Sequence, residues 1–194
     1  MDGFEKRREQ KKKKIIEAAY ALFMEFGIQK VSVAEIANKA NVSQVTIYNY
    51  FENKDNLVRI VFKYFVDQIW NEQKLALESD IPFDEKIKGI IFDKGMHASQ
   101  ISTRFFQDFM KDYASGQSYV EEVYVNEALP LLIKLFDEGR LQGYIDPTVS
   151  NEAILFYLQM FQLYLQREEA TQAILPIAEE LTKLFFYGIA GKKD

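Results

Sequence analysis

Two signals for the start of a helix lie only eleven residues apart, and they limit what the N-terminal part of this chain can fold into. Ser32 is followed three residues later by Glu35, the pattern of a capping box, which predicts a helix directly after Ser32. Ser43 can cap a second short helix over residues 44–51. Between them lies Asn41, a residue that tolerates the left-handed backbone that a tight turn requires. Two short helices around a tight turn are typical of a helix-turn-helix, whose second helix can enter the major groove of DNA.

The segments on either side of this pair predict two further helices. Apolar residues recur at helical spacing over residues 15–26, and Gly27 follows at the point where such a helix often ends. Asn53 can cap a fourth helix, which the apolar pattern predicts over residues 54–78. We therefore expect a group of three helices that leads directly into a long fourth helix.

The rest of the chain also has helical periodicity, which predicts an all-α fold. Strand signals are weak, because no run of alternating apolar and polar residues lies between turn dipeptides. We expect a three-helix helix-turn-helix domain over residues 1–53 and an all-helical domain over residues 54–194. The further helices expected in the second domain span residues 82–95, 99–114, 118–138, 147–167 and 176–190.

Charge is divided unevenly along the chain. Residues 1–64 contain 12 Lys and Arg against 8 Asp and Glu, a net charge of +4, whereas residues 65–194 contain 12 against 21, a net charge of −9. A basic first part can face a polyanion such as DNA, while an acidic remainder favours solubility. The run Lys11–Lys14 is equally consistent with a solvated helix end, so charge alone leaves both interpretations open.

Composition argues against an enzyme. Cysteine is absent and histidine occurs once, at His97, which excludes thiolate chemistry, cysteine-based metal sites and mechanisms that need two histidines. Adjacent acidic residues such as Glu121-Glu122 and Glu168-Glu169 diverge on a helix, and no glycine-rich phosphate loop occurs. We therefore expect no catalytic site, no cofactor and no metal. A helical scaffold for protein partners and, less favoured, an all-helical enzyme remain as alternatives to a DNA-binding protein.

The sequence also predicts a cytoplasmic protein without a membrane partner. No apolar run approaches the roughly 18 residues of a membrane span. The charged N-terminus has neither the apolar core nor the cleavage site of a signal peptide. A chain without cysteine is compatible with a reducing compartment.

The outer face of the second short helix carries groups that suit DNA. The amides of Gln44 and Asn49 can pair with adenine edges, and Val45 can contact a thymine methyl group. The hydroxyls of Thr46 and Tyr48 can bind phosphates. A helical hairpin with a polar outer face is the alternative, but it does not explain two closely spaced caps beside a lysine-rich segment.

A longer pattern extends over residues 15–58. The first expected helix contains an Ala-Ala pair and a Leu-Phe pair and ends in glycine. A serine cap then precedes an Ile-Ala pair in the second helix. A Val-Ser turn precedes Tyr-x-Tyr-Phe in the third helix, and Lys-Asp-x-Leu begins the fourth. Its residues are Ile16, Ala18, Ala19, Leu22, Phe23, Gly27, Ser32, Ile36, Ala37, Val42, Ser43, Tyr48, Asn49, Tyr50, Phe51, Lys54, Asp55, Asn56 and Leu57. In residue types and spacings, this segment resembles the DNA-binding segment of the tetracycline-repressor (TetR) family of bacterial transcriptional regulators. The family usually has glycine where this chain has Asn41, a mild departure because asparagine tolerates the same backbone.

The resemblance implies a homodimeric, ligand-responsive regulator, most often a repressor, that binds a near-palindromic operator in double-stranded DNA. It implies that residues 1–53 bind DNA, and that residues 54–194 bind a small effector and form the dimer. Tyr48 and Lys54 match family positions that hold phosphates. The full set of predicted DNA-binding residues is Ser43, Gln44, Val45, Thr46, Tyr48, Asn49 and Lys54.

For the second domain, the resemblance implies an aromatic effector cavity and a dimer formed by the last two long helices. Aromatic residues at helical spacing are more often plain core, so that interpretation of the cavity residues stays open. An apolar or amphipathic effector suits a lining with few charges. The candidate lining residues are Trp70, His97, Phe105, Phe109, Met110, Tyr113 and Tyr124. The candidate interface residues are Phe156, Met160, Leu163, Tyr164, Leu181, Leu184 and Phe185.

Overall fold

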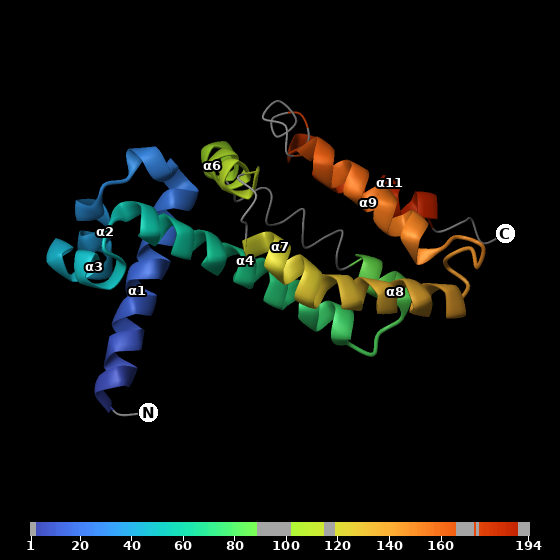
Figure 1. Ribbon diagram of the computed structural model, residues 1–194, viewed down its shortest axis with the longest axis horizontal. Helices are drawn as coiled ribbons and strands as arrows, with labels where there is room; N and C mark the ends of the chain where they lie inside the picture. Colours follow the sequence, from blue (N-terminus) through green and yellow to red (C-terminus); the bar gives the residue numbers. More distant parts are fainter. Residues whose placement is uncertain (1–2, 89–101, 115–118, 166–172, 174, 190–194) are drawn as a thin grey trace. The chain divides into compact units, whose positions relative to one another are not determined.

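The computed structural model of the chain (Figure 1) describes residues 3–88, 102–114, 119–165, 173 and 175–189. Every regular element in these ranges is helical, and none of these residues forms a strand. The predicted all-α fold is therefore confirmed. No helix of the described residues combines the length and the apolar character that crossing a membrane requires.

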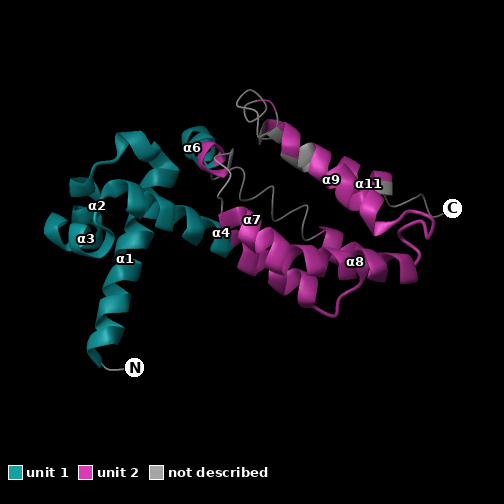
Figure 2. Ribbon diagram, viewed as in Figure 1, with its two compact units in different colours: residues 1–68, 101–109 teal, residues 69–100, 110–194 magenta. Residues whose placement is uncertain are grey.

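The chain forms two compact units (Figure 2). The first contains residues 1–68 and 101–109, and the second contains residues 69–100 and 110–194. The division falls inside α4 (Lys54–Glu78) and inside α6 (Thr103–Ala114). The expected boundary between residues 53 and 54 is a division by role, and it stays a prediction.

The first unit begins with α1 (Gly3–Phe26), which continues through the 3-10 turn η1 (Ile28–Lys30) to α2 (Val33–Ala40) and α3 (Gln44–Phe51). The predicted bounds of the two short helices and of α4 coincide with those in the structure. The core of this unit consists of Ile15, Ala18, Ala19, Phe23, Ile28, Val31, Ile36, Ala37, Ile47, Phe51, Leu57, Val61, Phe62, Phe65 and Phe105.

Side-chain caps explain why the helices of this unit start where they do. The Ser32 hydroxyl accepts a hydrogen bond from the Glu35 amide at 3.2 Å, and the Ser32 amide donates to the Glu35 carboxylate at 2.7 Å, which completes the predicted capping box. Hydrogen bonds from Ser32 lower the pKa of the Glu35 carboxyl. The Ser43 hydroxyl accepts from the Thr46 amide at 3.1 Å in the same way. Local sequence therefore sets the boundaries of both short helices.

Among the described residues, two other than glycine have a positive φ, and both lie beside α3. Asn41 has the left-handed backbone expected of it, with φ 53° and ψ 50°. No sequence signal indicates a positive φ at Glu52, yet its backbone has φ 65° and ψ −50°. The Asn53 amide donates to the Phe51 carbonyl at 2.7 Å across it, so Glu52 is the centre of a γ-turn, a rare and strained conformation. The connection from α3 to α4 is thus very short and carries backbone strain.

The second unit contains the C-terminal part of α4, helical residues 83–88, and a nearly continuous run made of α7 (Tyr119–Val123), η2 (Tyr124–Ala128) and α8 (Leu129–Leu141). Further on lie α9 (Asn151–Leu165), the 3-10 turn η3 (Leu175–Ile177) and α11 (Ala178–Ile189). Its described core consists of Leu77, Phe83, Ile87, Leu135, Phe136, Ile145, Ile154, Phe185 and Phe186.

A buried cation joins three segments of this unit. The Lys86 ammonium, which is 3% exposed, donates to the Leu77 carbonyl at 3.0 Å and to the Glu138 carboxylate at 2.8 Å. Leu77 lies in the last turn of α4, where carbonyl groups lack partners within the helix and a positive charge is favoured. This pair therefore ties the end of α4 to α8 and to residues 83–88.

The structure corrects three of the expected helices. The helix expected to begin at about residue 15 extends back to Gly3. The helix expected over residues 118–138 contains a π-helical segment, η2, and ends at Leu141. The helix expected from residue 147 begins at Asn151, because the Asp146 carboxylate accepts from the Thr148 amide at 2.8 Å and so forms a turn before the helix. Parts of the helices expected over 82–95, 99–114, 147–167 and 176–190 lie outside the described residues.

The strained turn at Glu52 gives a stability prediction. We expect Glu52→Gly to raise the free energy of unfolding by about 1 kcal/mol, because glycine adopts a positive φ without steric cost. Urea unfolding followed by circular dichroism measures this difference. Glu52→Ala is the matched control, since it also removes the 3.2 Å hydrogen bond from Asn56 to the Glu52 carboxylate but keeps a Cβ atom. Equal stability of the two variants would contradict the argument from strain.

Candidate nucleic-acid interface

The candidate interface is the outer face of α3. Ile47 and Phe51 point into the core and are almost completely buried. Gln44, Val45, Tyr48 and Asn49 are all exposed, with 67% of Val45 and 45% of Tyr48 accessible. A large exposed valine and tyrosine on an eight-residue helix are not needed for the core of this unit. The structure thus brings together four of the predicted DNA-binding residues on one accessible face.

Two other predicted residues, Ser43 and Thr46, are bound to each other. Their hydroxyl oxygens are 2.8 Å apart, and Ser43 also caps the helix through the Thr46 amide. Each hydroxyl still has capacity for one more hydrogen bond. Their main structural effect is to fix the first turn of α3, and their contact with DNA stays a prediction.

Lys54 lies at the first position of α4, but its ammonium is engaged inside the protein. It donates to the Ile28 carbonyl at 2.7 Å and lies 6.0 Å from the centre of the Phe23 ring. This hydrogen bond joins the start of α4 to η1, and the side chain is only partly exposed. An ammonium has three donors, so a phosphate contact is compatible with this bond. Lys54 therefore has a structural role that sequence reasoning missed.

The chemistry of the α3 face is neutral. Its sequence, QVTIYNYF, contains no charged residue, so the helix offers amides, hydroxyls and one aliphatic side chain. Such groups can read base edges, but protein affinity for DNA comes largely from cations that neutralise phosphates. This face can therefore supply discrimination between sequences better than it can supply overall affinity.

The predicted effector residues do not form one group in the structure. Phe105, which is fully buried, and Phe109 pack edge-on against Phe62 and Phe65 of α4 at ring-centre distances of 5.1–5.7 Å. These two phenylalanines thus pack into the aromatic cluster of the first unit, and their part in a cavity lining stays a prediction. Trp70, Met110, Tyr113 and Tyr124 belong to the second unit and are half-buried, and His97 lies outside the described residues. The role of these five residues in effector binding stays a prediction.

A polar cluster that the sequence did not indicate connects α4 with η2. The Trp70 indole donates to the Glu127 carboxylate at 2.9 Å, and the Lys74 ammonium donates to the same oxygen at 2.8 Å. These bonds, first that from Lys74 and then that from Trp70, lower the pKa of Glu127. In the same π-helical segment, burial and, secondarily, Tyr113 raise the pKa of Tyr124. Segments of π-helix are often found at functional sites.

The last two long helices expose a large apolar surface. On α9 the exposed side chains include Phe156 (65%) and Met160 (50%), and on α11 Leu184 is 70% exposed. The two helices lie side by side (Figure 1). The Tyr157 and Phe185 rings stack between them, with their centres 5.7 Å apart. In the single chain Phe185 is buried and Leu181 is half-buried, and the place of both residues in a dimer interface stays a prediction. Leu163 and Tyr164 are exposed as expected, and the structure adds Tyr157 and Tyr187, which helical spacing from Met160 and Leu184 could have indicated.

Among the described residues, no three His, Cys, Asp or Glu side chains gather in a way that could hold a metal ion.

Comparison with known proteins agrees with this arrangement of helices. The sequence model for the tetR family of bacterial regulatory proteins matches residues 15–61. The uncharacterized HTH-type transcriptional regulator YhgD of Bacillus subtilis is 26% identical over 139 residues, which cover 71% of this chain and 73% of YhgD.

Two solved structures share the fold. The ketosteroid transcriptional regulator KstR2 of Mycobacterium tuberculosis has a TM-score of 0.56 and 18% identity, with 92% of this chain and 94% of that chain covered. The transcriptional regulator FadR from Bacillus subtilis, in complex with stearoyl-CoA, has a TM-score of 0.57 and 21% identity, with 91% and 98% covered. The match at residues 15–61 spans the C-terminal half of α1, all of α2 and α3, and the start of α4, the elements that build the helix-turn-helix. The chain therefore belongs to the tetR family of bacterial regulatory proteins.

Proposed function

We propose that this chain is a cytoplasmic, homodimeric transcriptional repressor that binds a near-palindromic operator and releases it when a small apolar or amphipathic effector binds. The observation that carries this proposal is the exposed, uncharged face of α3 on a capped helix-turn-helix. Its four accessible side chains have no role in the core, and they suit base edges and phosphates. The family match adds that such chains are DNA-binding regulators.

Each side chain of this face has a defined part in the proposed complex. The amides of Gln44 and Asn49 pair with the edges of adenines in the major groove. Val45 contacts a thymine methyl group, and the Tyr48 hydroxyl donates to a phosphate. Lys54 supports the interface through its bond to the Ile28 carbonyl and offers its remaining donors to the backbone of the DNA.

Substitutions on this face test the proposal. We expect Gln44→Ala or Asn49→Ala to relax preference at particular base pairs by about 1–3 kcal/mol, whereas Tyr48→Phe weakens binding to all sequences about equally. Lys54→Met should lower both DNA affinity and the melting temperature, because it removes the hydrogen bond to Ile28 while keeping the aliphatic stem. The measurement is fluorescence anisotropy on the DNA upstream of the chain's own gene, after footprinting has located the site.

Asn49→Ala is the control for the Lys54→Met variant. Asn49 is exposed and outside the core, so its substitution should leave the melting temperature unchanged. If the wild-type protein shows no salt-dependent affinity for any DNA, the proposal fails and a helical scaffold for protein partners becomes the better interpretation.

The apolar surface of α9 and α11 supports the homodimer. A monomer seldom exposes a contiguous apolar patch that contains several large side chains. A two-fold axis would place two copies of each helix together and bury Phe156, Met160 and Leu184 in one interface. It would also present two copies of α3 to half-sites whose centres are one helical turn apart, or a multiple of it, and this is why we propose a near-palindromic operator.

Charge introduced into this surface should separate the two copies. We expect Met160→Asp combined with Leu184→Asp to change a dimer into a monomer at micromolar concentration and to abolish tight operator binding. Both side chains are at least half exposed in the single chain, so the fold should survive. Sedimentation equilibrium measures the association, and circular dichroism checks the fold. Glu152→Gln, an exposed change at the start of α9, is the control. A wild-type monomer that still binds a palindrome tightly would exclude this assembly.

The second unit supports an effector that acts through α4. This helix extends from the end of the helix-turn-helix to the Trp70–Glu127 cluster, so a molecule bound near η2 that moves α4 can change the spacing of the two α3 helices. Such coupling requires that the effector bind the two conformations with different affinity. The related FadR structure contains stearoyl-CoA and KstR2 is described as a ketosteroid regulator, so an effector with a large apolar part is our choice for this chain.

Trp70 provides a reporter, because it is the only tryptophan and bonds to Glu127. We expect stearoyl-CoA, used as an acyl thioester probe, to change Trp70 fluorescence and to weaken operator binding together, by roughly 5–150-fold. Operator DNA should weaken binding of the probe by the same factor. Trp70→Phe should lose the fluorescence signal, and free coenzyme A is the control for the headgroup. A fluorescence change without any effect on DNA affinity would contradict coupling through α4.

A further inference from the structure

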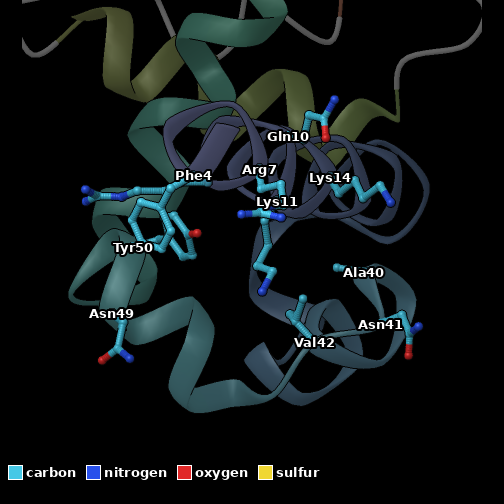
Figure 3. A pocket seen from close by; sticks show the side chains of 11 residues that line it. Phe4, Arg7, Gln10, Lys11, Lys14, Ala40, Asn41, Val42, Asn49 and Tyr50 are labelled. Carbon is cyan, nitrogen blue, oxygen red and sulfur yellow. The ribbon is translucent and has the colours of Figure 1, made fainter. Parts of the chain in front are cut away.

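The N-terminal half of α1 and the helix-turn-helix enclose a groove, and Asn49 is the one proposed α3 contact that lines it. Its volume is about 720 Å³, and its lining includes Arg7, Arg8, Lys11 and Lys14 from α1 but no carboxylate (Figure 3). We propose that this groove holds the DNA backbone next to the half-site read by α3, and that α1 supplies the cationic phosphate contacts that the uncharged α3 lacks. This inference rests on the proposed function and adds a second DNA-binding element to it.

Three of these cations form one row along the helix. Arg7, Lys11 and Lys14 are spaced four and three residues apart, so they lie on the same face. They span about 10 Å along the helix axis at 1.5 Å per residue. A row of this kind suits a chain of phosphates, whereas a single small anion would use only one or two of its members. The lining therefore favours a polyanion.

Within the described residues, the charges of this row have no ion-pair partner. By contrast, Lys13, on another face of α1, pairs with Glu17 at 3.7 Å. All three side chains of the row are exposed. Figure 3 shows Lys11 extending from α1 toward Val42 in the turn between α2 and α3. These cations are thus available to a ligand in the groove.

The opposite wall connects the groove to the α3 face. It includes Asn41, whose exposed amide can donate to phosphate oxygens, and Asn49, the exposed α3 residue proposed to read adenine. Asn49 also belongs to the exposed face of α3, so one duplex can contact both surfaces without a break. On the same side, the Arg8 guanidinium lies 5.9 Å from the centre of the Tyr50 ring, within the range of a cation–π interaction between α1 and α3. The row is therefore carried on a helix that is held against the helix-turn-helix.

The test compares two triple variants that remove the same number of charges from α1. The first variant, Arg7→Gln with Lys11→Gln and Lys14→Gln, removes all three charges of the row. The matched control, Lys6→Gln with Lys12→Gln and Lys13→Gln, removes charges that do not line the groove. Affinity is measured over a series of salt concentrations for two duplexes, the footprinted operator alone and the operator with flanking base pairs. Circular dichroism confirms that both variants are folded, and the single variant Lys11→Gln is measured in addition.

We expect the wild-type protein and the control to bind the flanked duplex more tightly than the operator alone, and the first variant to lose this difference. Each lost phosphate contact should reduce the slope of log affinity against log salt by about 0.9, so the first variant should lose up to about five in a dimer. Lys11→Gln should lose about two, and the control well under half of the loss in the first variant. Preference among operator sequences should not change.

Equal slopes for the two triple variants, with sequence preference intact, would overturn the groove proposal and leave the proposed function standing. Absence of specific binding by the wild-type protein would overturn both.

Discussion

The first unit depends on the packing of α1 against the helix-turn-helix. Ile15, Ala19 and Phe23 of α1 are fully buried, and they belong to the core against which the two short helices pack. Helices of eight residues are not stable by themselves in water, so α2 and α3 exist only because their apolar sides are covered. The caps at Ser32 and Ser43 then decide where each helix begins. Every feature of the α3 face follows from this support, because the same buried contacts that stabilise α3 also fix which of its side chains remain outside.

The sequence predicted the first unit well because its signals are local. Capping residues, the left-handed Asn41 and the glycine after α1 act within a few positions, and the bounds of α2, α3 and α4 coincide with those expected. The start of α1 at Gly3 was not predicted, because a lysine-rich segment has little apolar periodicity to indicate a helix. The γ-turn at Glu52 had no signal, since glutamate is not a residue that favours a positive φ.

The predictions for the second domain were weaker because they depend on tertiary packing. Helical spacing shows that Phe105 and Phe109 share a face, but it cannot show whether that face meets a cavity or the aromatic side chains of α4. In the same way, Phe185 and Leu184 are neighbours in an apolar helix, and only the structure shows that the first is buried and the second exposed. The bond between Trp70 and Glu127 joins residues 57 positions apart, a distance at which sequence patterns carry no information.

The absence of charge from α3 affects how the DNA-binding specificity of such a protein can evolve. Attraction to phosphates is needed to search along DNA, while groups that contact base edges determine where the search stops. In this chain the cations of the first unit that line its groove are on α1, and the groups proposed to read bases are on α3. If DNA is bound as proposed, a mutation on α3 can redirect the protein to a new operator without removing its general affinity for DNA. Duplicated copies of such a gene would be able to diverge in target while each copy keeps a working search mechanism.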